Sequence, residues 1–133
     1  MGTLGDEVRT WTAPIQSRPH WVRTGIQLRG GHEYHFTTTG CWTDLHYHCD
    51  ADGYPSRNWV LRLFEWARRV PDAQWFALVG ALDGHRSDKF VIGTQTTHQA
   101  LSDGELLCFA NDVWLAYFNN HGKVELHVTE VSD

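Results

Sequence analysis

Short strand patterns separated by glycine-bearing turns constrain the fold of this chain more than any other feature of its sequence. The clearest lie in the C-terminal third, where residues 105–110 form an apolar run and residues 123–131 alternate apolar with polar side chains. Gly104 and Gly122 stand in the turns that precede these runs. A period of two places successive side chains on opposite faces of a sheet, so that one face is buried and the other solvated. Both runs are therefore predicted to be antiparallel strands.

Four further segments are predicted to be strands, and one other segment is predicted to be a helix. The strands are residues 24–28, 33–39, 75–82 and 90–94. Residues 56–70 instead carry apolar side chains at helical spacing, with Ser56 as a candidate N-cap and Pro71 as a stop. Trp59 and Trp66 of this segment are expected to pack against the sheets. The pattern predicts an all-β fold, a jelly-roll-like antiparallel β-sandwich with one inserted short α-helix, built as a single domain over residues 1–133.

Charge, hydrophobicity and cysteine content limit the kinds of partner and the cellular compartment expected for this chain. The chain has 16 acidic and 11 basic residues, a formal net charge of −5, and no basic stripe, which argues against nucleic acid as a partner. It lacks the roughly 20 consecutive apolar residues of a spanning helix, so no membrane insertion is expected. Its three cysteines form no Cys-x-x-Cys pair, and its N-terminus shows no secretory signal pattern. We expect a cytoplasmic protein with reduced thiols, with release from the cell by another route left open.

The sequence shows no pattern typical of a catalytic centre. It has no Gly-x-Ser-x-Gly nucleophile elbow, and none of its cysteines stands in a recognisable catalytic context. Carboxylates are numerous, but the separations that glycoside hydrolysis requires are not set by sequence. We therefore expect a binding protein and not an enzyme.

The loop between the last two predicted strands, residues 111–122, concentrates polar groups suited to calcium. It holds one carboxylate, Asp112, and three amides, of which Asn119 and Asn120 are adjacent. Calcium takes six to eight oxygen ligands from carboxylates, amides and main-chain carbonyls. Sugar hydroxyls can complete such a shell while hydrogen-bonding to the same side chains. The alternative from spacing alone is an ordinary turn, because Asn, Asp and Gly are common turn residues.

Residues 104–128 give this loop a more specific interpretation. A glycine-initiated apolar strand is followed in order by Asn111-Asp112-Val113, Tyr117, Asn119-Asn120, and Gly122 with a strand of alternating valine. This order resembles the C-terminal part of the PA-I-type galactophilic lectins, which are calcium-dependent, galactose-binding bacterial proteins. Weaker similarity extends back to about residue 24. The resemblance implies a galactose-binding-domain-like β-sandwich, with calcium as its cofactor and a carbohydrate or other polyhydroxyl compound as its ligand.

The resemblance also assigns roles to individual residues. The ion would be held by the side chains of Asp112, Asn119 and Asn120, and by main-chain carbonyls at Ala116 and near Asp44. The sugar would contact Asp112, Asn119 and Val113. The chain departs from the family where Trp114-Leu115-Ala116 replaces Pro-Gly-Thr and Phe118 replaces a glycine.

Other positions are candidates for the sugar site by location or side-chain type. Trp42 and Trp114 flank the predicted site and could stack on a sugar ring. His48 and Asp52 are candidates by position in the segment 41–54, which is predicted to be a loop. Because isolated sugar sites bind weakly, a homo-oligomer would add avidity.

Two alternatives to a calcium-dependent lectin remain open at this stage. The bulky side chains in place of Pro-Gly-Thr could have made the site an apolar surface of a calcium-free protein-interaction or structural β-sandwich. A metal-binding protein is the second alternative, because His46 and His48 share one face of an extended segment, with Asp50 in phase, and could bind zinc.

Overall fold

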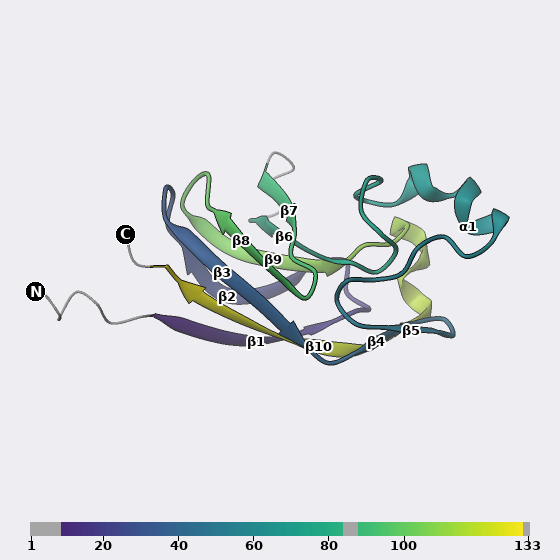
Figure 1. Cartoon of the computed structure of the whole chain (residues 1–133), viewed down its shortest axis with the longest axis horizontal. Helices are drawn as coiled ribbons and strands as arrows, with labels where there is room; N and C mark the ends of the chain where they lie inside the picture. Colours follow the sequence, from purple (N-terminus) through teal and green to yellow (C-terminus); the bar gives the residue numbers. More distant parts are fainter. Residues whose placement is uncertain (1–8, 84–87, 132–133) are drawn as a thin grey trace, which may run out of the picture.

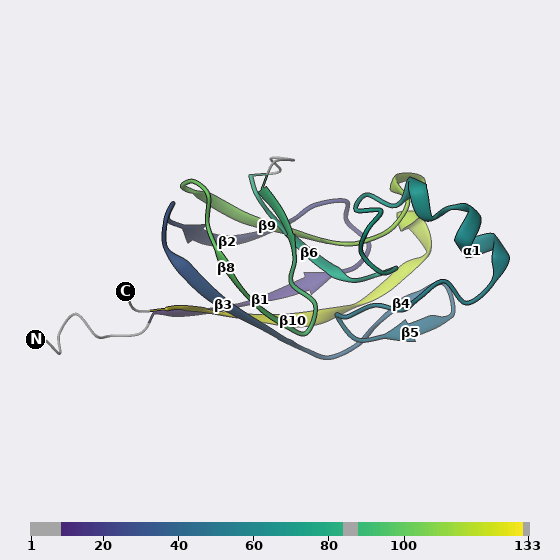
Figure 2. The same cartoon turned by 45° about the horizontal axis from the view of Figure 1, so that its top comes forward.

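Two antiparallel β-sheets pack face to face in the computed structural model, which describes residues 9–83 and 88–131 (Figures 1 and 2). The larger sheet has the order β5-β4-β10-β3-β8, with β1 also paired to β10, and the smaller has the order β2-β9-β6-β7. The larger sheet comprises β1 (Thr10–Gln16), β3 (Glu33–Thr39), β4 (Trp42–Asp44), β5 (Tyr47–Cys49), β8 (Gln95–Gln99) and β10 (Asn120–Glu130). The smaller comprises β2 (Val22–Leu28), β6 (Leu78–Leu82), β7 (Lys89–Val91) and β9 (Gly104–Ala110). The predicted all-β sandwich is confirmed; residues 1–8, 84–87 and 132–133 of the predicted domain lie outside the described residues.

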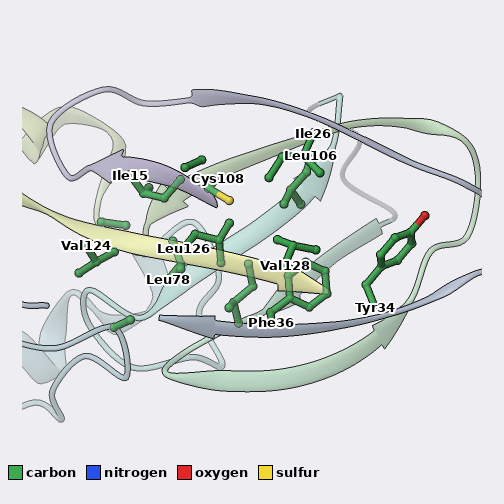
Figure 3. Close-up of a cluster of buried hydrophobic side chains, with 14 of the residues drawn as sticks. Ile15, Ile26, Tyr34, Phe36, Leu78, Leu106, Cys108, Val124, Leu126 and Val128 are labelled. Atoms are coloured by element: carbon green, nitrogen blue, oxygen red, sulfur yellow. The ribbon is translucent and has the colours of Figure 1, made fainter. Parts of the chain in front are cut away.

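The longest strand, β10, links the core to one end of the sandwich. Residues 123–129 pair with β1 and residues 125–130 with β3, whereas residues 120–122 pair with β4. Val124, Leu126 and Val128 are at most 1% exposed and point into the core, where Phe36 and Leu78 also lie (Figure 3). Burying each such side chain contributes about 1.5–3 kcal/mol. A shift of one residue would expose all three, so this alternation fixes the register of β10.

Other strands differ from the prediction. β1 and β8 are not predicted from the sequence; each pairs with a single neighbour, and edge strands need only one apolar face or none. β4 and β5 lie within the segment 41–54, which is predicted to be a loop. The strand predicted at 75–82 begins only at Leu78, because Phe76 has a positive φ of 64° that breaks the extended backbone. The strand predicted at 90–94 is Lys89–Val91, and Gly93 turns the chain with φ 61°.

The inserted helix is shorter than predicted. α1 covers Trp59–Leu63, and a 3-10 turn, η2 (Glu65–Ala67), follows it. Asn58 is its N-cap, because its side chain accepts a hydrogen bond from the Leu61 amide at 2.9 Å. The predicted cap, Ser56, instead hydrogen-bonds to the Glu65 carboxylate.

The helical segment projects from the end of the sandwich and does not pack on a sheet (Figures 1 and 2). Neither α1 nor η2 contains a buried residue. Trp59 and Trp66 are 72% and 75% exposed, so the expectation that they pack against the sheets is wrong. Within residues 9–83 and 88–131, no helix combines the length and the apolar character needed to cross a membrane.

Candidate metal and ligand site

The candidate ligand residues meet at the end of the sandwich that carries α1. Asp112 follows β9, Asn119 ends the 3-10 helix η4 (Trp114–Asn119), and Asn120 begins β10. The β10–β4 register places Asn120 opposite Asp44. The Leu45 amide donates a hydrogen bond to the Asn119 carbonyl at 3.0 Å. Strand pairing therefore brings the earlier segment, near residue 44, against the loop that the sequence singled out.

A pocket of about 300 Å³ opens at this point. Asp44, Asp112, Ala116 and Asn119 line it, so four of the five residues predicted to hold an ion surround one space. The fifth, Asn120, is completely buried. The rest of the lining is mostly apolar and comprises Leu45, Tyr47, Tyr54, Leu61, Phe64, Trp75 and Val113. The pocket thus combines a small group of oxygen ligands with a larger apolar wall.

Three side-chain oxygens in this group are buried without a hydrogen-bond partner. They are Asp112 Oδ2, Asn119 Oδ1 and Asn120 Oδ1. Leaving a polar atom buried and unpaired costs about 1–3 kcal/mol, and more for a charged group. The orientation of Asn120 is fixed because its Nδ2 donates a hydrogen bond to the Ser17 carbonyl at 2.9 Å. One carboxylate and two amide oxygens that lack partners form a donor set that suits calcium.

The electrostatics of the pocket also favour a cation. Burial, followed by the charge of Asp44, raises the pKa of Asp112 from 3.8 to about 7. Burial also raises the pKa of Asp44, although its carboxylate accepts a hydrogen bond from the Tyr54 hydroxyl at 2.5 Å, which favours the ionised form. Two carboxyl groups in one apolar pocket disfavour each other's ionisation. A divalent cation between them would remove that penalty.

Asn111, next to the central carboxylate, has a structural role. It is completely buried, and its Oδ1 accepts a hydrogen bond from the Val70 amide at 2.9 Å. Its Nδ2 donates to the carbonyls of Val70, Ala73 and Gln74 at 2.9–3.2 Å. These bonds fasten the segment 70–74 to the end of β9. Asn111 therefore holds the backbone next to Asp112 in place. The sequence did not predict this role of Asn111.

The two tryptophans predicted to stack on a sugar lie elsewhere. Trp42 is completely buried in the core and does not line the pocket. Its ring forms a T-shaped contact with Phe76, with centroids 5.5 Å apart. Trp114 is 48% exposed but stacks on His20, with centroids 4.0 Å apart. It does not line the pocket. The expectation that these rings form a wall of the site is wrong, because strand pairing buries one and η4 turns the other away.

The position-based candidates His48 and Asp52 also lie outside the pocket lining. His48 is exposed on β5 and hydrogen-bonds to the Thr43 hydroxyl at 3.0 Å. Asp52 is exposed, and its carboxylate accepts hydrogen bonds from the amide and hydroxyl of Thr94. No group of three or more His, Cys, Asp and Glu side chains able to hold a metal occurs among the described residues, so the zinc hypothesis built on His46 and His48 gains no ligand set there.

The aromatic wall of the pocket comes from residues that sequence reasoning missed. Tyr47 and Tyr54 stack with centroids 4.9 Å apart and an interplanar angle of 18°. Trp75 joins them because Tyr54 and Trp75 form an isolated antiparallel bridge. Their signal in the sequence is only the aromatic residue type, since the contacts depend on pairing between distant segments. Val113, predicted to touch the sugar, does line this pocket.

A comparison with solved structures finds the same architecture in another protein. The N-terminal domain of EclA, described as a PllA-like lectin, matches with a TM-score of 0.67, and the match covers 91% of this chain and 96% of that domain. The chain has the fold of a PllA-like lectin. The sequence identity is 15%, so the likeness is one of fold. No protein-family model and no curated protein sequence matches the chain.

The PllA-like lectin fold agrees with the resemblance carried by residues 104–128. The resemblance to PA-I-type lectins is thus confirmed for the fold, including the antiparallel sandwich that it implies. The inserted segment with α1 and η2 borders the candidate site, since Leu61 and Phe64 line the pocket. The lectin fold therefore presents a pocket with an apolar side wall contributed by this segment.

Proposed function

We propose that the chain is a carbohydrate-binding, lectin-like module that holds a sugar or other polyhydroxyl ligand at a calcium site in this pocket. The observation that carries the proposal is the set of three buried oxygens without partners, on Asp112, Asn119 and Asn120. They lie beside a pocket large enough for a small ligand, in a chain with the fold of a lectin. The fold alone would leave the ligand class open.

The side chains of Asp112, Asn119 and Asn120 would hold the ion, together with main-chain carbonyls at Ala116 and near Asp44. Bound there, calcium would supply open coordination positions for two neighbouring hydroxyl groups. The second oxygen of Asp112 already accepts a hydrogen bond from the Val113 amide at 2.7 Å, which fixes the orientation of the carboxylate. Asp112 and Asn119 would also hydrogen-bond to ligand hydroxyls.

The apolar side of the pocket supplies the second part of recognition. Sugar rings have apolar faces that pack on aromatic side chains, and Tyr47, Tyr54 and Trp75 provide such a surface here. These rings take the place that was expected for Trp42 and Trp114. The ligand would therefore lie between a polar, ion-bearing side and an aromatic side.

Calorimetric titration with calcium tests the metal site directly. We expect wild-type protein to bind calcium and the variant Asp112→Asn to lose binding, because an amide cannot replace the central charge. The matched control is Asp72→Asn, which removes the same charge from an exposed carboxylate outside the pocket. Absence of calcium binding by the wild-type protein, or undiminished binding by Asp112→Asn, would overturn the proposal. A glycan array read with and without chelator then identifies the ligand class.

A calcium-free interaction domain is the second candidate function. It is favoured by the exposure of Leu115 and Trp114, which are 83% and 48% exposed. The PA-I-type lectins that the sequence resembles carry glycine and proline at these positions. This candidate predicts no heat of calcium binding and no glycan signal. The same titration therefore separates the two.

A further inference from the structure

Exposed apolar side chains gather at the end of the molecule that carries α1. Six of them define what we call the apolar tip: Trp59, Leu63 and Phe64 in and just after α1, Trp66 in η2, and Leu115 and Phe118 in η4. Each is between 49% and 83% exposed. The segments lie together, because residues of α1 and of η4 line the same pocket. In both views α1 is the outermost element, opposite the end where β1 begins and β10 ends (Figures 1 and 2).

The apolar tip is comparable in size to the largest apolar patch expected on a monomer of this kind. Trp59, Trp66 and Phe118 are each about three quarters exposed. Since an aromatic side chain offers roughly 150–250 Å², these three rings alone expose roughly 400 Å². The largest apolar patch of a typical monomer is roughly 300–600 Å². The three remaining side chains carry the tip to the upper end of that range, and patches of this size are often functional.

Charge identifies the kind of partner. The segment 57–69 holds four of the chain's 11 basic residues and one of its 16 acidic residues. Arg68 is buried, whereas Arg57 and Arg62 are exposed and lie close to Trp59 in the sequence. Protein surfaces that lie in the interface of a bilayer typically combine tryptophan and aliphatic side chains with arginine. The arginines contact anionic headgroups there.

The position of the pocket argues against a second copy of the chain as the occupant. Phe64 belongs to the tip and lines the pocket, and Leu45, 58% exposed, lies at the same rim. Any partner seated on the tip therefore lies over the pocket mouth. A lipid surface would bring the headgroup layer, where glycans are attached to lipids, to that mouth, whereas a second copy would bring only its own protein surface. This choice of occupant rests on the proposed carbohydrate-binding function.

We propose that the apolar tip docks the protein end-on onto a lipid bilayer that carries anionic headgroups. The tryptophan, leucine and phenylalanine side chains enter the interfacial layer, while Arg57 and Arg62 contact lipid phosphates. The sandwich stays outside the bilayer, and its opposite end, where β1 begins, points away. Such docking lies on the membrane and does not span it.

Sedimentation with vesicles tests the proposal. Vesicles of phosphatidylcholine and phosphatidylserine, without glycolipid, are mixed with the protein in chelator, so that neither the calcium site nor a glycan contributes. We expect the wild-type protein to bind, and Trp66→Asp and the double variant Leu115→Asp/Phe118→Asp to bind at least tenfold more weakly. The control is Leu101→Asp, because Leu101 is 68% exposed in the β8–β9 connection, outside the tip. All replaced side chains are at least 68% exposed, so thermal unfolding should stay unchanged.

Several results would overturn the proposal. One is absence of wild-type binding at millimolar lipid; another is equal binding by the tip variants. Sedimentation equilibrium without lipid provides a second readout. Concentration-dependent dimers that disappear in Leu115→Asp/Phe118→Asp would assign the tip to a second copy instead. Failure of the calcium site is seen separately, in the titration without lipid, and leaves the vesicle result in chelator unaffected.

Discussion

Asp112 is a buried carboxyl group with one oxygen that has no hydrogen-bond partner, and in the proposed site it is the residue through which pH and calcium would act. Only 3% of its surface is exposed. Its pKa is raised by burial and by the charge of Asp44. The protonated form is favoured in the absence of a cation, whereas the ionised form is the one that binds calcium. Proton and calcium therefore compete for the same group.

The first prediction concerns stability without calcium. The pKa of Asp112 is about 7 in the folded protein, against 3.8 for an unperturbed group. Between about pH 4 and pH 7 the folded state therefore binds a proton that the unfolded chain releases, so the free energy of unfolding falls as pH rises. Asp112→Asn removes this fall, and the free energy of unfolding of the variant should exceed that of wild type at pH 8 by on the order of 4 kcal/mol. Urea denaturation in chelator at pH 5 and pH 8 measures the difference, and an unchanged pH slope in the variant contradicts it.

The second prediction concerns calcium affinity. Because the ion requires ionised Asp112, the affinity should be nearly constant above pH 7 and fall below it, approaching tenfold per pH unit for a single competing proton. Calorimetric titrations at pH 5.5, 6.5 and 7.5 follow this dependence, with Asp72→Asn as the control that should behave like wild type. An affinity independent of pH over this interval would contradict competition between a proton and calcium at Asp112.

At the residue scale, the sequence identified the candidate oxygen ligands but not the aromatic wall of the pocket. Asp112, Asn119 and Asn120 stand close together in one recognisable stretch. Tyr54 and Trp75, in contrast, meet through a bridge between segments 21 positions apart, and no local pattern encodes it. Trp42 was wrongly placed at the sugar site for a similar reason. Its ring packs on Phe76, which lies far along the chain, and no local pattern encodes that contact.

At the scale of elements, the turn before Tyr54 sets the position of the aromatic wall. The Gly53 amide donates a hydrogen bond to the Asp50 carbonyl at 3.1 Å, which closes the turn. Gly53 has a φ of 79°, and a side chain at this position would meet the Trp75 carbonyl and come within 2.6 Å of the Ala77 amide nitrogen. The close approach of these two backbones therefore requires glycine.

The third prediction compares two glycines with similar backbone angles. Gly31 has a φ of 84°, and a side chain there would meet no atom within 4 Å. Gly31→Ala should cost only the strain of the left-handed conformation, about 1–2 kcal/mol. Gly53→Ala adds a clash with backbone atoms, which cannot rotate away, and should cost at least about 3 kcal/mol. Chemical denaturation of both variants measures the difference, and equal losses would contradict the close approach at Gly53.

Elements with strong local patterns were predictable, and elements defined by their neighbours were not. β3 and β10 alternate apolar with polar residues, and their core faces follow directly from that. β8 is entirely polar and forms only because β3 offers it a partner. The helical spacing of residues 60–67 predicted a helix correctly in kind, but its apolar side was assigned to the core when it faces outward. Periodicity shows which side of a helix is apolar and does not show what covers it.

At the scale of the whole molecule, the candidate functional features gather at one end. The core lies in the sheets and is built from side chains such as Leu126 and Phe36 (Figure 3). The candidate calcium site, the pocket and the apolar tip lie where β4, β10 and η4 meet. Tyr54 and Trp75 belong both to the pocket lining and to the core, whereas the tip side chains are exposed. Changes at the tip can alter binding while the sandwich remains intact.

The final prediction follows from the way the calcium site joins distant segments. Its ligand residues come from β4, the segment after β9, and the start of β10, which separate when the sandwich unfolds. An ion that binds only the folded chain stabilises it by about 2.7 kcal/mol at a free concentration one hundred times its dissociation constant. For a domain of this size the midpoint of thermal unfolding should rise by roughly 10 °C. Thermal denaturation with calcium and with chelator tests this, and Asp112→Asn should show no rise. An ion held by these three segments must oppose their separation, because it binds only the folded chain. If wild-type protein binds calcium by calorimetry but its unfolding midpoint is unchanged, the ion is therefore held at another site that does not depend on the fold.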